Sequence, residues 1–299
     1  MRFLNPKTDF AFKRIFGSAE SGDILISFLN ALLGLEGKHR IEAVEILDPY
    51  LAPKIRGMKD TYLDVKVRDV QGRNYIIEMQ VLNVHGFEQR ILYNACKAYA
   101  GQIARGEDYE LLTDVIAITI TDFVMFEELP GLLNRFKLRA DDGAVYSDDL
   151  ELVFVELPKF KLPEDELSNT MERWLYFLKH GGDLRAVPAS LSDEPAIQHA
   201  FAIANKAGLS PEELDDQERR EIFIQDQRGA RTKALAEGRA EGLAEGRAEG
   251  EAIGEARGRA EGLVEGEVLG LEKGLNLALQ RLLASGIDEV QARQMLRLA

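Results

Sequence analysis

The sequence has a single cysteine among 299 residues, Cys96, and no apolar run that approaches the roughly 18 residues of a membrane span. One cysteine excludes an internal disulfide and suits a reducing compartment. The stretch 1–17 also lacks the long apolar segment of a secretory signal peptide. These absences predict a soluble, cytoplasmic protein that does not enter a membrane.

Motifs for zinc and for nucleotides are missing as well. The four histidines, His39, His85, His180 and His199, have no zinc-like spacing to one another or to Cys96. Neither GxxxxGK[ST] nor GxGxxG occurs, so no phosphate-cradling loop is indicated. The sequence therefore gives no reason to expect a zinc protein or a nucleotide-binding protein.

A net positive charge, the usual mark of a nucleic-acid-binding protein, is absent, because the formal net charge is −14. The excess acid is unevenly distributed. Residues 1–110 contain 15 Lys and Arg and 15 Asp and Glu, whereas residues 111–299 contain 22 and 36. The overall charge therefore neither supports nor excludes an N-terminal half that faces DNA.

Apolar periodicity predicts alternating helices and strands over the first 160 residues. Thr8 or Asp9 is a candidate N-cap for the first helix, and a β-branched apolar run at 114–123 is typical of a strand buried on both faces. We expect an α/β fold in which a mixed sheet is flanked by helices. The expected helices lie near 9–16, 24–35 and 87–106, and the expected strands near 41–50, 62–69, 73–81, 114–123 and 150–157.

Strand patterns cease after about residue 163, and only helical patterns follow. Ser210 and Pro211 have the residue types of an N-cap and a first helical position. This change predicts three parts: a core at 1–162, a helical extension at 163–229 and a C-terminal tail at 230–299.

The tail carries glycine at every fourth position from Gly238 to Gly274, with Ala, Glu, Arg and Leu between the glycines. Ten glycines cost a helix about 8–10 kcal/mol relative to alanine, although the other residues favour helix. The glycine row also drifts by about 40° per four residues. Two interpretations remain open: a helix whose small residues allow close contact and self-association, or a semi-flexible acidic extension.

The stretch YLDVKVRDVQGRNYIIEMQ, at 62–80, predicts a β-hairpin. Alternation places Leu63, Val65 and Val67 on the apolar face. Pairing those residues with the apolar face of the second strand requires a three-residue loop at 70–72 with Gly72 in the left-handed region. In this register Asp64 lies opposite Glu78, with Cβ atoms about 5 Å apart.

Two carboxylates this close repel each other unless something compensates their charge. A divalent cation such as Mg²⁺ binds hard oxygen ligands and is one compensation, with Gln80 on the same face and Lys66 diagonal to Glu78. The alternative is a solvated hairpin face whose charged residues form weak surface pairs.

The segments NPKTDFAFKRIFG, KDTYLDVKVRD and IIEMQ resemble the recombination-promoting nucleases and transposases of the PD-(D/E)XK nuclease superfamily. The resemblance covers roughly residues 5–160, and the tail is also similar to the C-terminal ends of members. It implies a restriction-endonuclease-like core and a metal-dependent DNA endonuclease that hydrolyses phosphodiester bonds. A role in recombination, mobile-element movement or phage defence is the corresponding expectation.

The resemblance also implies site residues. Asp64 and Glu78 would be the ligands of Mg²⁺, for which Mn²⁺ can substitute, and Gln80 stands where a lysine is usual. The catalytic positive charge would then come from Lys66 or, as the weaker candidate, from Lys13.

We expect DNA as the substrate and self-association through the tail. The candidate DNA-binding residues are Lys7, Lys13, Arg14 and Arg90, for which surface roles are the alternative. The competing hypothesis for the whole chain is a non-catalytic DNA- or protein-binding module that assembles through its helical tail.

Overall fold

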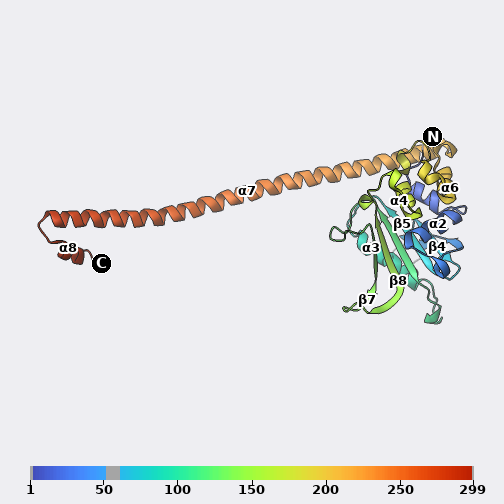
Figure 1. Ribbon diagram of the computed structural model, residues 1–299, viewed down its shortest axis with the longest axis horizontal. Helices are drawn as coiled ribbons and strands as arrows, with labels where there is room; N and C mark the ends of the chain where they lie inside the picture. The colour runs from blue at the N-terminus through green and yellow to red at the C-terminus, as the bar shows by residue number, and fades with distance from the viewer. Residues whose placement is uncertain (1–2, 52–60, 298–299) are drawn as a thin grey trace. The chain divides into compact units, whose positions relative to one another are not determined.

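The computed structural model describes residues 3–51 and 61–297. The chain divides into two compact units, Met1–Arg228 and Gly229–Ala299. A six-stranded mixed sheet forms the centre of the first unit, in the order β1-β4-β5-β6-β8-β7. Strands β4, β5, β7 and β8 of this sheet are labelled in Figure 1. Strands β5, β6 and β8 are parallel to one another, and the other pairs are antiparallel.

The strands of this sheet and of a separate two-stranded sheet, β2-β3, have the following bounds: β1 Val44–Leu47, β2 Tyr50–Leu51, β3 Thr61–Tyr62, β4 Val65–Asp69, β5 Asn74–Gln80, β6 Val115–Thr121, β7 Leu133–Arg139 and β8 Val145–Glu156. Every residue of β6 is buried, as its β-branched apolar run predicts.

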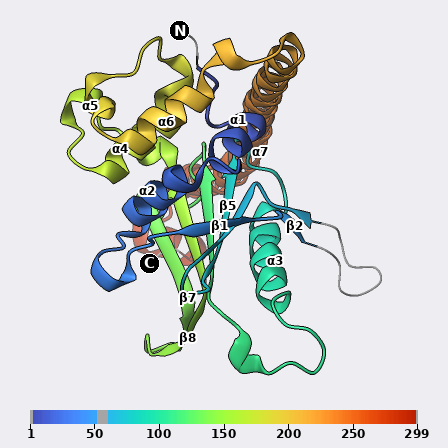
Figure 2. The same cartoon turned by 90° about the vertical axis from the view of Figure 1, so that its right-hand side faces the viewer.

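Helices cover both faces of the sheet (Figure 2). One face shares a continuous apolar core with α1, α2, α4, α5 and α6, and the other face packs against α3. The helices that follow residue 163 thus share a core with those at the start of the chain. The bounds are α1 Asp9–Phe16, α2 Gly22–Leu33, α3 Phe87–Ala100, α4 Thr170–His180, α5 Ala189–Ser192, α6 Pro195–Ala204, α7 Pro211–Ala284 and α8 Glu289–Met295.

The hairpin of β4 and β5 has the predicted register. Val65 pairs with Ile77, and the same alignment continues to Arg68 and Asn74. Gly72 has φ +85°, which the third position of the three-residue loop requires. The predicted mixed sheet flanked by helices and the helical C-terminal extension are confirmed.

Two local predictions were wrong, and one strand was missed. Leu63 belongs to the core beneath α3 rather than to that of Val65 and Val67, because the chain bends at Asp64 before β4 begins. Helix α3 ends at Ala100, where Gly101 caps it, and does not reach 106. Strand β7 was not predicted, because an edge strand exposed on much of its surface has a weak apolar signal.

Helix α7 begins at Pro211, as predicted, and continues without a break through the glycine repeat to Ala284. Ion pairs one turn apart support the repeat, among them Arg247 with Glu251 and Arg257 with Glu261. The chain then turns at Gly286, whose φ is +90°, into α8. Among the residues described, no helix has the length and apolar character to cross a membrane.

The first turns of α7 belong to the compact unit that contains the sheet. Gln217 is 1% exposed and accepts a hydrogen bond from the Thr8 hydroxyl at 3.2 Å. Glu213 pairs with Arg14 at 2.7 Å. This part of α7 is therefore packed against α1.

A chain that ends at residue 228 should unfold cooperatively with a free energy close to that of the full chain, because it keeps these contacts. A chain that ends at 210 should lose at least about 1–3 kcal/mol, because the partners of Thr8 and Arg14 are removed. Urea unfolding followed by circular dichroism measures both. Equal stability of the two truncated chains, or an insoluble 1–228 chain, would contradict the expectation.

Candidate active site

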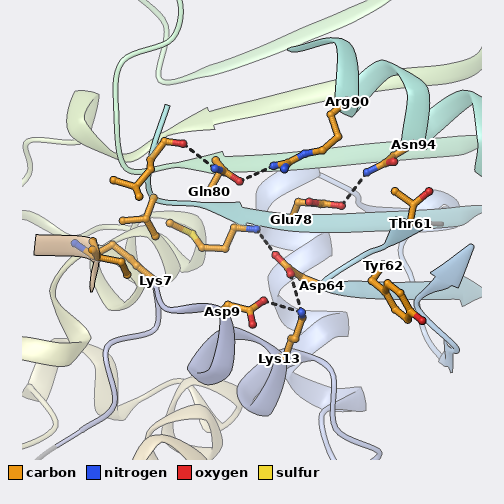
Figure 3. Close-up of a pocket in the computed structure, with 14 residues that line it drawn as sticks. Lys7, Asp9, Lys13, Thr61, Tyr62, Asp64, Glu78, Gln80, Arg90 and Asn94 are labelled. Carbon is orange, nitrogen blue, oxygen red and sulfur yellow. Dashed lines mark hydrogen bonds and ion pairs between the residues drawn. The ribbon is translucent and has the colours of Figure 1, made fainter. Parts of the chain in front are cut away.

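A cavity of about 340 Å³ lies at the end of the sheet where β4 begins and β5 finishes (Figure 3). Its walls come from α1, β3, the bend before β4, β5, α3 and α7. The lining residues are Lys7, Asp9, Lys13, Thr61, Tyr62, Asp64, Glu78, Met79, Gln80, Val81, Leu82, Arg90, Asn94 and Ile224. Asp64, Glu78 and Gln80, predicted to lie together, all line this cavity.

Asp64 occupies the bend that precedes β4, and its side chain is 12% exposed. Its Oδ2 accepts a hydrogen bond from the Met79 N–H at 2.9 Å, where the backbone pairing of β4 and β5 has stopped. Its Oδ1 lies 3.3 Å from Lys13 Nζ. Burial raises the pKa of Asp64 to about 6, although the Met79 hydrogen bond and the charge of Lys13 lower it.

Glu78 lies near the end of β5, and its Oε1 accepts a hydrogen bond from Asn94 Nδ2 at 3.4 Å. Burial, together with the negative charge of Asp64, raises the pKa of Glu78 to about 7. Arg90 and Asn94 act in the opposite direction. The negative charge of Asp64 is thus the second cause, after burial, of the raised pKa of Glu78.

Gln80 is held at both ends of its amide. Its Nε2 donates to the Leu82 carbonyl at 2.7 Å, and its Oε1 accepts from Arg90 Nη2 at 2.9 Å. The Arg90 guanidinium also lies over the Phe87 ring, 5.3 Å from its centroid. Gln80 thus fixes a cationic side chain at the wall of the cavity.

The two lysines considered for catalysis occupy different places. Lys13 lines the cavity and contacts Asp64, whereas Lys66 is not a lining residue. Lys66 lies within the ladder, between Leu47 of β1 and Ile76 of β5, and the cavity lies beyond the start of β4. Burial and the nearby Arg68 lower the pKa of Lys66.

The other candidate DNA-binding residues also differ in whether they line the cavity. Lys7 lines the cavity and pairs with Asp122 at 3.2 Å. Arg14 is not among the lining residues and pairs with Glu213 of α7. The cavity therefore brings together Lys7, Lys13 and Arg90 but not Arg14.

Sequence reasoning missed several polar residues of the cavity, among them Asp9 and Asn94. Asp9, considered only as a helix cap, lies 2.6 Å from Lys13 through Oδ1. Its i, i+4 spacing to Lys13 was a usable signal, but nothing local shows that this pair faces Asp64. Asn94 projects from α3, and no sequence pattern connects it to Glu78.

The lining residues suit a hard divalent cation. Mg²⁺ in proteins is often held by one or two carboxylates with waters, and Asp64 and Glu78 supply such a pair. The buried Asn94 Oδ1 has no hydrogen-bond partner among the residues described, so a further oxygen beside Glu78 is unsatisfied. The described residues contain no group of three or more His, Cys, Asp and Glu suited to a metal ion.

The family model described as PD-(D/E)XK nuclease family transposase matches residues 6–234. The match includes the sheet, the cavity and the first turns of α7. Comparisons with curated proteins and with solved structures gave no match.

The raised pKa of Glu78 implies a stability that depends on pH. A carboxyl whose folded pKa is raised from 4.5 to about 7 is stabilising below its ordinary pKa and loses this contribution as the pH rises to about 7. In metal-free buffer, Glu78→Gln should therefore be more stable than wild type at pH 8, on the order of 2 kcal/mol. The difference should shrink towards pH 4.

Urea unfolding in EDTA at several pH values measures this difference. The exposed Glu42 provides a matched control, because Glu42→Gln removes a carboxylate outside the cavity. A stability difference between Glu78→Gln and wild type that stays constant from pH 4 to 8 would show that the surroundings of Glu78 do not raise its pKa.

Proposed function

The chain belongs to the PD-(D/E)XK nuclease family transposases, and from this premise we propose that it is a metal-dependent DNA endonuclease that hydrolyses phosphodiester bonds. The observation that carries the proposal is the pair of partly buried carboxylates, Asp64 and Glu78, in one cavity that Lys7, Lys13 and Arg90 also line. Cleavage of this kind supports recombination, mobile-element movement or phage defence.

Asp64 and Glu78 are the proposed ligands of Mg²⁺, with Mn²⁺ as a substitute. When bound, the cation polarises the phosphodiester and lowers the pKa of a coordinated water. The Met79 N–H fixes one oxygen of Asp64, and Asn94 orients Glu78 from α3. Both carboxylates are thus held in place by neighbours before DNA arrives.

Lys13 is the proposed source of the positive charge that the family usually takes from a lysine at the position of Gln80. Its ammonium already lies beside Asp64, and a cation at this place stabilises negative charge that develops on the phosphate. Lys66 is less suited because it does not line the cavity. Gln80 holds Arg90, which can then contact a neighbouring phosphate.

We propose that DNA binds along the wall of the cavity that carries Lys7, Lys13 and Arg90. Tyr62, 70% exposed at the wall of the cavity, offers an aromatic surface beside the same path. Arg14 pairs with Glu213 and does not line the cavity, so its contribution to DNA binding acts over a longer distance.

Purified protein should nick or cut supercoiled plasmid only with Mg²⁺ or Mn²⁺. Asp64→Asn and Glu78→Gln should each lower the rate by at least about 100-fold, because each removes a ligand charge. Lys13→Gln should lower the rate by about 100-fold, whereas Lys66→Gln should have a small effect. Gel analysis of initial rates measures all four variants.

Two measurements make the result specific. Glu42→Gln controls for loss of a carboxylate, and Mg²⁺ should raise the melting temperature of wild type but not of Glu78→Gln. An equal rise in both would place the metal elsewhere, for example on the acidic part of α7. Wild-type protein that binds DNA and never cuts it would instead support a non-catalytic binding module.

The second unit is the proposed self-association element. Its part of α7 exposes Val264, Val268 and Leu271, which follow one another at spacings of four and three. This is the spacing of residues that pack between helices in a coiled coil. A second copy of the same helix is the partner that this pattern fits.

The full chain should therefore show a larger mass than one monomer in light scattering, and a chain ending at residue 228 should be monomeric. Val268→Glu in the full chain should have the same effect as truncation, because it places a charge in the contact. Arg247→Gln, which changes an exposed residue paired with Glu251 of its own helix, serves as a control for changes in the helix outside that segment. A monomeric full chain at all concentrations would contradict self-association.

A further inference from the structure

A row of charged side chains leads from α7 to the base of the cavity. Arg220 Nη1 lies 3.1 Å from Asp9 Oδ2, and Lys13 Nζ lies 2.6 Å from Asp9 Oδ1. The same Lys13 Nζ lies 3.3 Å from Asp64 Oδ1 (Figure 3). Asp9 therefore uses one carboxylate oxygen for each cation, and the four side chains alternate in sign.

The Lys13 ammonium needs contacts that hold it in position more than the other charged groups of the site do. Its side chain is long, is 42% exposed and extends from a helix of eight residues. A flexible ammonium in this setting has many positions available, and its pair with Asp64 alone is a single contact. The shorter contact to Asp9 restrains the ammonium, and Arg220 fixes the carboxylate that provides the restraint.

The position of Arg220 is itself well defined. Gln217 is buried against Thr8, the N-cap of α1, and Glu213 pairs with Arg14. Positions 213, 217 and 220 lie on one face of a helix, so α7 presents Arg220 to α1 from an already packed surface. Ile224, one turn further along, lines the cavity.

We propose that Arg220 and Asp9 are positioning residues for Lys13, so that the first turns of α7 complete the active site. The inference rests on the proposed function, in which Lys13 supplies positive charge beside Asp64. It adds a requirement that is not evident from the two carboxylates. The strands and α1 do not form a complete active site without α7, a helix that begins more than 130 residues after β5.

Arg220→Gln should lower the single-turnover rate of plasmid cleavage by about 10- to 100-fold, the usual effect of removing a residue that orients another. Affinity for DNA, measured by fluorescence anisotropy with Ca²⁺ in place of Mg²⁺, should stay close to that of wild type. Arg220→Lys keeps a cation near Asp9 and should recover part of the rate.

Two control variants lie on the same helix. Arg219→Gln removes an exposed arginine that pairs with Asp215 of its own helix. Asp215→Asn removes the acidic partner of the same pair and leaves Asp9 and Lys13 untouched. Both variants should cut plasmid at the wild-type rate, which separates the effect of Arg220 on Lys13 from the loss of any charged residue on α7.

A second readout does not need cleavage. In protein with ¹³C-labelled lysine, the Lys13 ε-methylene signal is identified by its loss in Lys13→Gln. An immobilised ammonium should give two separate Hε signals in wild type and Arg219→Gln. These signals should merge in Arg220→Gln and Asp9→Asn.

Unchanged Lys13 signals in Arg220→Gln would overturn the proposal, as would a loss of DNA affinity with an unchanged single-turnover rate. If wild type never cuts DNA, the proposed endonuclease activity fails. The NMR comparison then still decides whether Arg220 positions Lys13.

Discussion

The two neighbouring carboxylates Asp64 and Glu78 in one cavity determine how this site is built. Asp64 and Glu78 are both partly buried, and this burial raises the pKa of each. Their surroundings offset part of that cost through the Met79 N–H from β5, Lys13 from α1 and Asn94 from α3. Because each compensating group comes from a different element, the site exists only when the sheet and the helices on both of its faces are assembled.

Local rules made the centre of this site predictable. Strand alternation and the positive φ of Gly72 fix the register of β4 and β5, and that register brings Asp64 and Glu78 to one end of the hairpin. The buried strand β6 was equally predictable, because a continuous run of apolar β-branched residues is typical of a strand buried on both faces. Both patterns depend on neighbours in the sequence and require no knowledge of packing.

The surroundings of the carboxylates were not predictable in this way. Alternation favoured Lys66, but the bend at Asp64 places the cavity beyond the ladder in which Lys66 lies. Asp9 and Asn94 reach the cavity because α1 and α3 pack on opposite faces of the sheet. Arg220 is more distant still in the sequence. Only tertiary packing decides which of many exposed charged helical residues meet a site.

The four-residue repeat of α7 has a consequence for how this protein can change over generations. Duplication or loss of one repeat lengthens or shortens the helix by about 6 Å and rotates all that follows by about 40°. No residue of the sheet or the cavity takes part in that change, since the repeat lies from Gly238 onwards. Nine such units restore the original angular phase, so a change in repeat number can alter the length of α7 while the sequence of the sheet and the cavity stays the same.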